Sequence, residues 1–230
     1  MARIILLRHA HSVANEKGIL SGQLPGVNLS PKGREQSVNL VSRIGNSGFD
    51  SIRVSPMQRC HETIQPWLES SHSSQLKRLT IDDGLIEMNY GSWSGRALKA
   101  LSKEKLWKLI QTTPSKVTFP DGERFTAMQK RAVNSIHEAI DEKKNGVHLF
   151  VSHGDVIKAI IAHLLTIKLD NFQSLVIDPA SITVLEYDGE KSQLLVFNDT
   201  ASSVERYANQ SKKKRLLLGG GSGAPTVKRR

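Results

Sequence analysis

The chain has 230 residues, of which 38% are hydrophobic and 23% charged, and this is the composition of a globular protein that can bury a sizeable core. Cys60 is the single cysteine, which excludes an internal disulfide and favours a reducing compartment. The first apolar run, residues 4–7, is shorter than the core of a signal peptide, and no run approaches the roughly 20 apolar residues of a membrane span. We therefore expect a cytoplasmic protein with no membrane partner.

The net charge of +10 comes mainly from one end of the chain. Residues 211–230 hold seven lysines and arginines and no acid, and the rest of the chain has 25 basic residues against 22 acidic ones. A body of such weak charge gives little support to a specific nucleic-acid partner. We predict one catalytic domain over residues 1–205, followed by a basic, glycine-rich and disordered tail over residues 206–230.

Three segments share one pattern, in which a short apolar strand runs into a polar residue and then into the start of a helix. They are residues 3–9, 51–55 and 147–153. Apolar runs that alternate with helices in this way are typical of βα units in a mostly parallel sheet. Near the end of the chain, residues 182–187 and 193–197 flank Asp188-Gly189, and this arrangement predicts a β-hairpin.

Helix starts are recognisable after the first two strands. Ser30 followed by Pro31 predicts an N-cap and a first helical residue. Ser55 with Gln58 predicts a capping box at the start of the next helix. The buried face of the first of these helices is expected to hold Val38, Val41 and Ile44.

The second half of the chain predicts two more helices, over residues 121–144 and 155–165. Residues 82–120 fit the alternation least, and we expect them to form a loop with short helices. The sequence therefore predicts an α/β fold, a three-layer α/β/α sandwich with a mostly parallel sheet. Residues 82–120 would be a small helical and loop insertion over the active site.

Polar residues stand at the ends of the three predicted strands. His9 ends the first, Ser55 ends the second with Arg59 close behind, and His153 ends the third. In open parallel sheets, ligands bind beyond the carboxyl ends of the strands. We therefore expect these three distant segments to deliver their side chains to one crevice.

The residue types in that crevice indicate a phosphate pocket. Arg8 and Arg59 suit phosphate oxygens, because a planar guanidinium binds two oxygens at once. His9 can attack phosphorus if one ring nitrogen is free and the other N–H is held, and His153 can donate a hydrogen bond to the transferring group. Glu87, in a glycine-punctuated loop, is the best candidate for the acid that protonates the leaving oxygen.

The sequence also resembles a known family, the histidine phosphatase superfamily, which is also called phosphoglycerate mutase-like. The matching motifs run in family order and are together highly specific. They are R-H-G-x-[ST]-x-x-N at residues 8–15, L-[ST]-x-x-G-x-x-Q at 29–36, S-P-x-x-R-x-x-x-T at 55–63, E-x-x-x-G-x-W-x-G at 87–95, P-x-G-E-S in part at 120–124 and V-[ST]-H-G at 151–154. One departure is Ala10, where the family usually has glycine.

The resemblance implies a phosphomonoester hydrolase that acts on a small phosphorylated metabolite through phosphohistidine. His9 would become phosphorylated, and Glu87 would be the general acid and then the general base. The phosphoryl oxygens would be held by Arg8, Arg59 and His153, with secondary contacts from Asn15 and the Gly154 amide. No metal or organic cofactor is implied, and a homodimer is left open.

Three alternatives stay open at this point. A phosphoglycerate mutase-like phosphomutase would pass the phosphoryl group to a hydroxyl, but Met88 replaces the arginine of the mutase pattern E-R-x-Y-G. A metal hydrolase would use His9, His11 and His153. A non-catalytic phosphate-binding or nucleic-acid-binding module would act through its basic tail. Substrate specificity is assigned to residues such as Leu24, Met88 and Asn89, together with residues 82–120.

Overall fold

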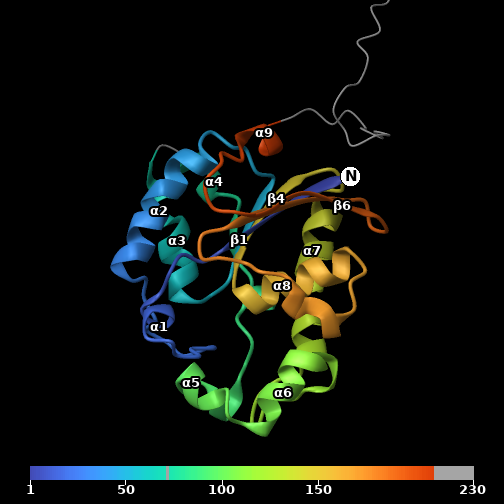
Figure 1. The fold of residues 1–230 in the computed structure, drawn as a ribbon. Helices are drawn as coiled ribbons and strands as arrows, with labels where there is room; N and C mark the ends of the chain where they lie inside the picture. Colours follow the sequence, from blue (N-terminus) through green and yellow to red (C-terminus); the bar gives the residue numbers. More distant parts are fainter. Residues whose placement is uncertain (71–72, 210–230) are drawn as a thin grey trace, which may run out of the picture.

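The computed structural model describes residues 1–70 and 73–209. Within them, six strands form one sheet in the order β3-β2-β4-β1-β5-β6 (Figure 1). The parallel strands are β1 (Ala2–Arg8), β2 (Ser51–Val54), β3 (Leu79–Ile81) and β4 (Val147–Ser152). The antiparallel strands are β5 (Ile182–Tyr187) and β6 (Ser192–Asp199), which form the predicted hairpin.

Helices cover both faces of this sheet (Figure 1). One face carries α2 (Pro31–Ile44) and α3 (Gln58–Glu69), and the other carries α7 (Phe125–Glu142) and α8 (Gly154–Leu164). The shorter helices are α1 (Val13–Glu16), α4 (Ser73–Leu76), α5 (Leu98–Leu101), α6 (Lys105–Thr112) and α9 (Glu205–Ala208). The 3-10 turns are η1 (Asp83–Leu85), η2 (Gly91–Trp93), η3 (Pro114–Lys116) and η4 (Leu169–Ser174).

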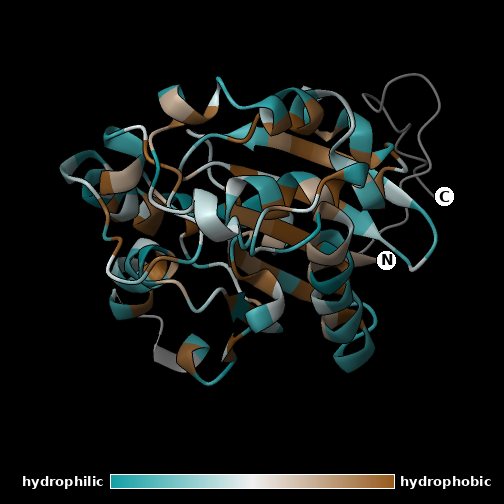
Figure 2. Ribbon diagram, turned by 90° about the horizontal axis from the view of Figure 1, so that it is seen from below, coloured by the Kyte–Doolittle hydropathy of each residue, from teal (hydrophilic) through white to brown (hydrophobic). Residues whose placement is uncertain are grey.

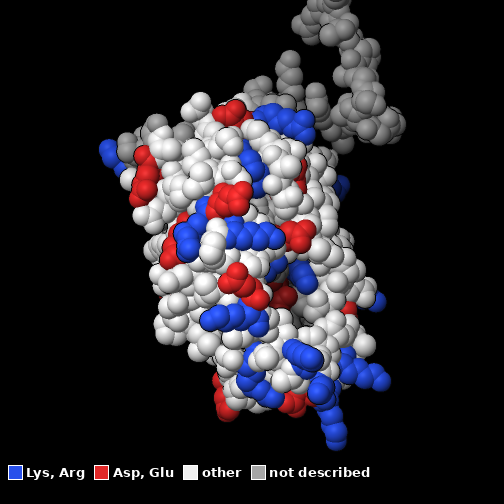
Figure 3. Space-filling view, turned by 60° about the vertical axis from the view of Figure 1, so that its left-hand side comes forward, with Lys and Arg blue, Asp and Glu red and all other residues white. Residues whose placement is uncertain are grey.

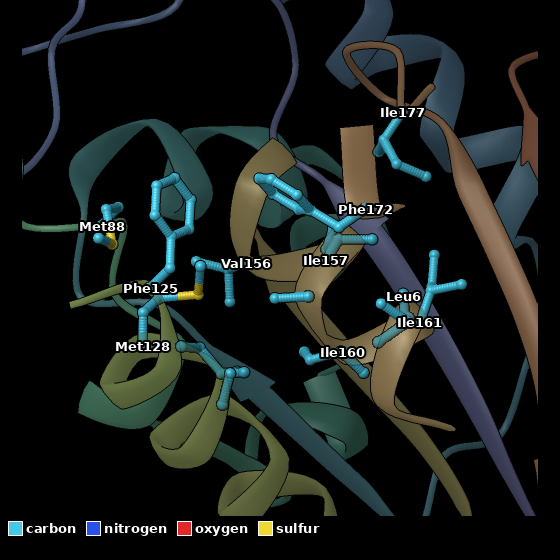
Figure 4. Packing of buried hydrophobic residues seen from close by; sticks show 14 of the residues in the cluster. Leu6, Met88, Phe125, Met128, Val156, Ile157, Ile160, Ile161, Phe172 and Ile177 are labelled. Carbon is cyan, nitrogen blue, oxygen red and sulfur yellow. The ribbon is translucent and has the colours of Figure 1, made fainter. Parts of the chain in front are cut away.

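The side chains of β1 supply both cores, because successive residues of a strand point to opposite faces. Ile5 and Leu7 belong to the cluster under α2 and α3, whereas Ile4 and Leu6 belong to the cluster under α7 and α8. Figure 4 shows Leu6 facing the inward side chains of α8, such as Ile161. Apolar segments accordingly lie in the central strands and on the inner helix faces (Figure 2). The predicted three-layer α/β/α sandwich is confirmed.

Two details of the predicted helices are wrong. Val38 is 60% exposed, and α2 instead buries Leu40 and Ile44 together with the polar Ser37 and Arg43. Ser55 does not cap α3, which begins at Gln58 and has no side-chain cap hydrogen bond at its N-cap Met57. By contrast, the Ser30 hydroxyl caps α2 by accepting from the Gly33 amide.

Residues 82–120 contain η1, η2, α5, α6 and η3, and α5 and α6 lie on the side of the sheet where β1 ends (Figure 1). The long helix predicted from residue 121 begins at Phe125 instead, after Asp121 with a φ of 56°. That residues 82–120 form an insertion over the active site remains a proposal.

The end of the described chain is packed against the sheet. Residues 206–208 belong to α9, in which Ala208 is buried, so they are not part of a disordered tail. Residues 210–230, which make up the rest of the predicted tail, lie outside the described residues. In the described part of the chain, every helix is too short or too polar to cross a bilayer.

Candidate active site

The carboxyl ends of β1 and β4 place two histidines side by side. Arg8 pairs with Ser152 in the parallel register, so His9 and His153 are the next residues of neighbouring strands. Their ring centroids are 5.2 Å apart, and both side chains are buried. The strand pattern in the sequence therefore placed them together correctly.

His9 is held in the form that a nucleophile needs. Its Nδ1 lies 2.8 Å from the carbonyl oxygen of Ala10, so Nδ1 carries the proton and donates it. Its Nε2 has no hydrogen-bond partner among the described residues, and His9 lines the main pocket. Burial, followed by the positive charges of Arg59 and Arg8, holds the pKa of His9 well below its ordinary value of 6.5. The ring is therefore neutral at neutral pH.

Ala10 fits the position where the family usually has glycine. Its amide donates a 2.8 Å hydrogen bond to the Thr63 hydroxyl, which itself bonds to the carbonyl oxygen of Arg59 at 2.6 Å. Ala10 is not among the described residues with positive φ, so its methyl group causes no strain there. These bonds tie the backbone behind His9 to α3.

Arg59 and Arg8 are each held by a backbone carbonyl, Arg8 through Nη1 to Ile177 at 2.5 Å, and each keeps at least one buried N–H group that lacks a partner among the described residues. Arg59 is 1% exposed and lies in the first turn of α3, where Nη2 donates to the Gly22 carbonyl at 2.9 Å. Its Nε and Nη1, and the Nε of Arg8, are buried without a hydrogen-bond partner in residues 1–70 and 73–209. Unpaired buried N–H groups of a cation are costly. Three of them converging beside a nucleophilic histidine indicate that the site is built for an anion.

These groups lie in or beneath a pocket of about 400 Å³, hereafter the main pocket. Its lining residues are Arg8, His9, Asn15, Ile19, Leu20, Ser21, Gly22, Glu87, Tyr90, Leu98, Gly154, Asp155, Lys158, Gln173, Leu175, Val176, Ile177 and Asp178. Arg59 and His153 are buried behind this lining. Figure 3 shows a face of the molecule where basic and acidic side chains are interspersed around a hollow.

Glu87 is placed as an acid. Its side chain is buried, with Oε1 accepting from the Met88 amide at 2.9 Å. Burial, followed by the negative charge of Asp155, raises the pKa of Glu87 from 4.5 to about 7, against the opposing effect of Arg59. A substantial share of the molecules therefore carries the proton at neutral pH, which suits a general acid.

His153 is neutral in this structure. Its Nδ1 lies 3.1 Å from Nη2 of Arg59 and its Nε2 lies 2.7 Å from the Ser55 hydroxyl. Because a guanidinium can only donate, Nδ1 accepts and Nε2 carries the hydrogen. Burial and Arg59 hold the pKa of His153 well below 6.5, so its 3.7 Å contact with Glu87 is not an ion pair.

Asn15 and Gly154, the predicted secondary contacts, both line the main pocket. Oδ1 of Asn15 accepts from the amide and hydroxyl of Ser12 and thereby caps α1, which leaves the Nδ2 group as a donor. Gly154 is the first residue of α8. Free N–H groups at a helix N-terminus favour an anion.

His11 is separated from the two site histidines. Its Nδ1 lies 2.8 Å from the Ser30 hydroxyl, and His11 does not line the main pocket. In the described part of the chain there is no group of three or more histidines, cysteines or acidic residues placed to hold a metal ion. This arrangement does not provide the ligand set of the metal-hydrolase alternative.

Cys60 is buried beside the site, with Sγ 3.6 Å from Nε2 of His153. Burial raises the pKa of its thiol to about 12. The nucleophile of a cysteine phosphatase is a thiolate, so Cys60 does not fit that role. Cys60 packs instead among apolar side chains of α3 such as Ile64 and Trp67.

Sequence reasoning missed the residues that surround the catalytic set. Tyr90 donates a 2.8 Å hydrogen bond to Oδ2 of Asp155, and both line the main pocket. Two signals in the sequence could have found them: Tyr90 stands three residues after Glu87, and Asp155 directly follows Gly154. Of the residues to which specificity was assigned, Leu24, Met88 and Asn89 do not line this pocket, and Met88 lies in the apolar core. Tyr90 and Leu98, which belong to residues 82–120, do line it.

These features together define a phosphoryl-transfer site with a neutral histidine as its candidate nucleophile. The model of the histidine phosphatase superfamily (branch 1) matches residues 4–200, and the chain belongs to this superfamily.

Named relatives include both phosphatases and a mutase. Phosphoserine phosphatase 1 of Hydrogenobacter thermophilus is 28% identical, over 92% of this chain and 99% of its own length. The 2,3-bisphosphoglycerate-dependent phosphoglycerate mutase of Thermoplasma acidophilum is 27% identical, over 89% and 97%. The crystal structure of the Shigella flexneri α-ribazole phosphatase matches with a TM-score of 0.74 and 25% identity, over 88% of this chain and 99% of that one.

Proposed function

We propose that this protein hydrolyses a small phosphomonoester through a phosphohistidine formed on His9. The observation that carries this proposal is the arrangement of His9 itself. Its Nδ1 is held by the Ala10 carbonyl, and its Nε2 has no partner among the described residues. Beside it, Nε of Arg8 and both Nε and Nη1 of Arg59 are buried and also lack a partner among the described residues. This geometry supplies a nucleophile and an oxyanion site at one place.

In the first step, Nε2 of His9 forms a bond to phosphorus while the bond from phosphorus to the ester oxygen breaks. The protonated Glu87 gives its proton to the departing alkoxide, so that the alcohol leaves neutral. Arg8 and Arg59 hold the equatorial oxygens, where negative charge is concentrated in the transition state. The Nδ1–H of His9 keeps its hydrogen bond to Ala10, which stabilises the positive charge that develops on the ring.

In the second step, the ionised Glu87 takes a proton from water as the oxygen of that water attacks phosphorus. The bond from phosphorus to Nε2 breaks, inorganic phosphate leaves, and His9 returns to its neutral form. His153 is proposed to act beside the phosphoryl group as a hydrogen-bond donor. A bound dianion favours protonation of Nδ1, and for this nitrogen to donate to the phosphoryl group, Nη2 of Arg59 has to turn away from it.

The phosphomutase alternative differs only in the acceptor, which would be a hydroxyl of the bound substrate. We favour water because Met88, at the position of the mutase arginine, is fully buried in the apolar core and offers no cation. A cytoplasmic location and a homodimer stay predictions.

The test combines two assays in the presence of EDTA. The first measures inorganic phosphate released from an alkyl phosphate, and we expect turnover by the wild type and a loss of at least about 10⁴-fold in His9→Ala. Full activity in His9→Ala would overturn the proposal. The second incubates the protein with 3-phosphoglycerate, with and without a bisphosphoglycerate primer. Released phosphate supports hydrolysis, whereas a phosphate moved to another hydroxyl supports the mutase.

A further inference from the structure

A second hollow, of about 210 Å³, adjoins the main pocket. Its walls are mostly apolar and aromatic, and they come from η2, α6 and the segment that leads into α7. The residues that line only this hollow are Trp93, Trp107, Ile110, Gln111, Phe119 and Phe125. Five further residues line both hollows, namely Leu20, Tyr90, Leu98, Asp155 and Gln173. The apolar hollow therefore begins where the main pocket ends.

The charges of the main pocket bear on what a substrate could carry besides its phosphate. Apart from Arg8, the one cation among the described lining residues is Lys158. Its ammonium group is engaged by neighbouring side chains, since Nζ donates to Oε1 of Gln173 at 3.0 Å, lies 3.8 Å from Oδ1 of Asp155 and stands 5.5 Å from the centre of the Phe172 ring. Asp155 and Asp178 line the same pocket. A carboxylate or a second phosphate on the substrate would have to compete with Asp155 for this one ammonium group, and a charge left unpaired in such a site is costly.

We propose, on the basis of the hydrolytic function above, that the substrate is the phosphate ester of a neutral alcohol with an apolar body. The phosphate binds beside His9, and the apolar body extends past Leu20 and Leu98 into the second hollow. An apolar cavity of about 150 Å³ is enough to hold benzene, so the second hollow has room for one ring or a short alkyl chain. Phosphoserine and phosphoglycerate, which carry a carboxylate, are expected to be poor substrates.

The experiment measures kcat/KM for phosphate release from a series of n-alkyl phosphates, from ethyl to octyl, and from O-phosphoserine and 3-phosphoglycerate. The alcohols of this series are nearly equal as leaving groups, so differences in kcat/KM report how well the alkyl chain of the substrate is bound. We expect kcat/KM to rise about threefold to fourfold per methylene until the hollow is full, the equivalent of about 0.8 kcal/mol per buried CH₂. Hexyl phosphate should exceed both carboxylate substrates by more than about tenfold.

Two variants locate the effect. Trp107 is partly buried and lines only the second hollow, so Trp107→Ala should lower the ratio of hexyl to ethyl phosphate activity by about tenfold. Leu109→Ala, on the exposed side of the same helix, is the matched control and should leave this ratio unchanged. Leu98→Arg adds a cation at the border of the two hollows and should raise kcat/KM for O-phosphoserine relative to hexyl phosphate. This second variant does not depend on whether Trp107→Ala folds.

The outcomes separate this inference from the function on which it rests. Turnover of ethyl phosphate with no gain along the series, or a preference for O-phosphoserine or 3-phosphoglycerate in the wild type, would overturn the inference and leave the hydrolase intact. An unchanged ratio in a folded Trp107→Ala variant would also overturn it. No phosphate release from any of these esters would overturn both.

Discussion

The hydroxyl of Tyr90 donates a 2.8 Å hydrogen bond to Oδ2 of Asp155, and this bond fixes a second carboxylate within the electrostatic reach of Glu87. Burial and the carboxylates of Asp155 and Glu87 raise the pKa of Tyr90 well above 10, so the phenol stays protonated and remains a donor. The negative charge of Asp155 in turn raises the pKa of Glu87, after the larger effect of burial. Asp155 is therefore a positioning residue that helps to keep the acid protonated.

Replacing Asp155 tests this relationship. Asp155→Asn removes the negative charge, so the pKa of Glu87 should fall below about 7 and the basic limb of kcat/KM against pH should move to lower pH. Asp178→Asn is the matched control, since Asp178 lines the same pocket but is not among the charges that shift Glu87. The account of Asp155 fails if its variant keeps the wild-type basic limb, or if both variants shift it equally.

The buried acid also makes stability depend on pH. Because the pKa of Glu87 is about 7 in the fold and near 4.5 outside it, the folded protein binds an extra proton between these values. This contribution to stability is fully present below pH 4.5 and is lost as the pH rises through about 7. Glu87→Gln has no such titration. The free energy of unfolding of this variant minus that of the wild type, measured with urea, should therefore be on the order of 2–3 kcal/mol higher at about pH 8 than at pH 4.5. If the free energies of unfolding of the variant and the wild type differ by the same amount at both pH values, the raised pKa assigned to Glu87 is contradicted.

Arg59 should not be replaceable by lysine. One of its nitrogens already bonds to the Gly22 carbonyl and to His153, and two more are unpartnered and available for phosphate. A lysine ammonium cannot make this set of contacts. We expect Arg59→Lys to lower kcat by about 10²–10³-fold and to weaken inhibition by inorganic phosphate. The control is Arg96→Lys in an exposed ion pair with Glu104, and an equal loss in both variants would argue against a role at the site.

Gly33 of α2 packs so closely against the backbone of His11 that position 33 has no room for a side chain. A Cβ at this position would lie 1.9 Å from the carbonyl oxygen of His11, which is backbone and cannot move alone. Gly33→Ala should therefore destabilise the protein by about 1–3 kcal/mol, although alanine is the better helix former. Gly48→Ala, with open space around its Cβ, should be neutral or slightly stabilising. Thermal unfolding of the two variants decides the point, and equal Tm values would contradict it.

The strands and the ends where His9 and His153 lie could be predicted from the sequence, because short apolar runs between helices produce a parallel sheet whatever the details of packing. The buried face of α2 could not. Ser37 and Arg43 are polar, yet both are buried because their donors reach backbone carbonyls of distant segments, such as that of Ala180 at 2.8 Å. The spacing of apolar residues along α2 does not reveal such contacts, and it therefore assigned Val38 to the core in place of Ser37 and Arg43.

The same limit applies to the site. His9 and His153 follow from the ends of their strands, whereas the bond from Tyr90 to Asp155 joins the loop that holds Glu87 to α8. Ser55 was predicted as a helix cap from its place before Pro56, but its hydroxyl contacts Nε2 of His153 instead. Tertiary contact decided between two roles that the local sequence allowed equally.

The central claim is that His9 carries the phosphoryl group during turnover. Rapid quenching of the protein with an alkyl phosphate labelled in its phosphate, followed by peptide mapping, tests it directly. The account predicts an acid-labile, base-stable label on His9 that forms and decays at rates compatible with kcat and is absent from His9→Ala. Turnover without a labelled histidine, or a label on another residue, would contradict it.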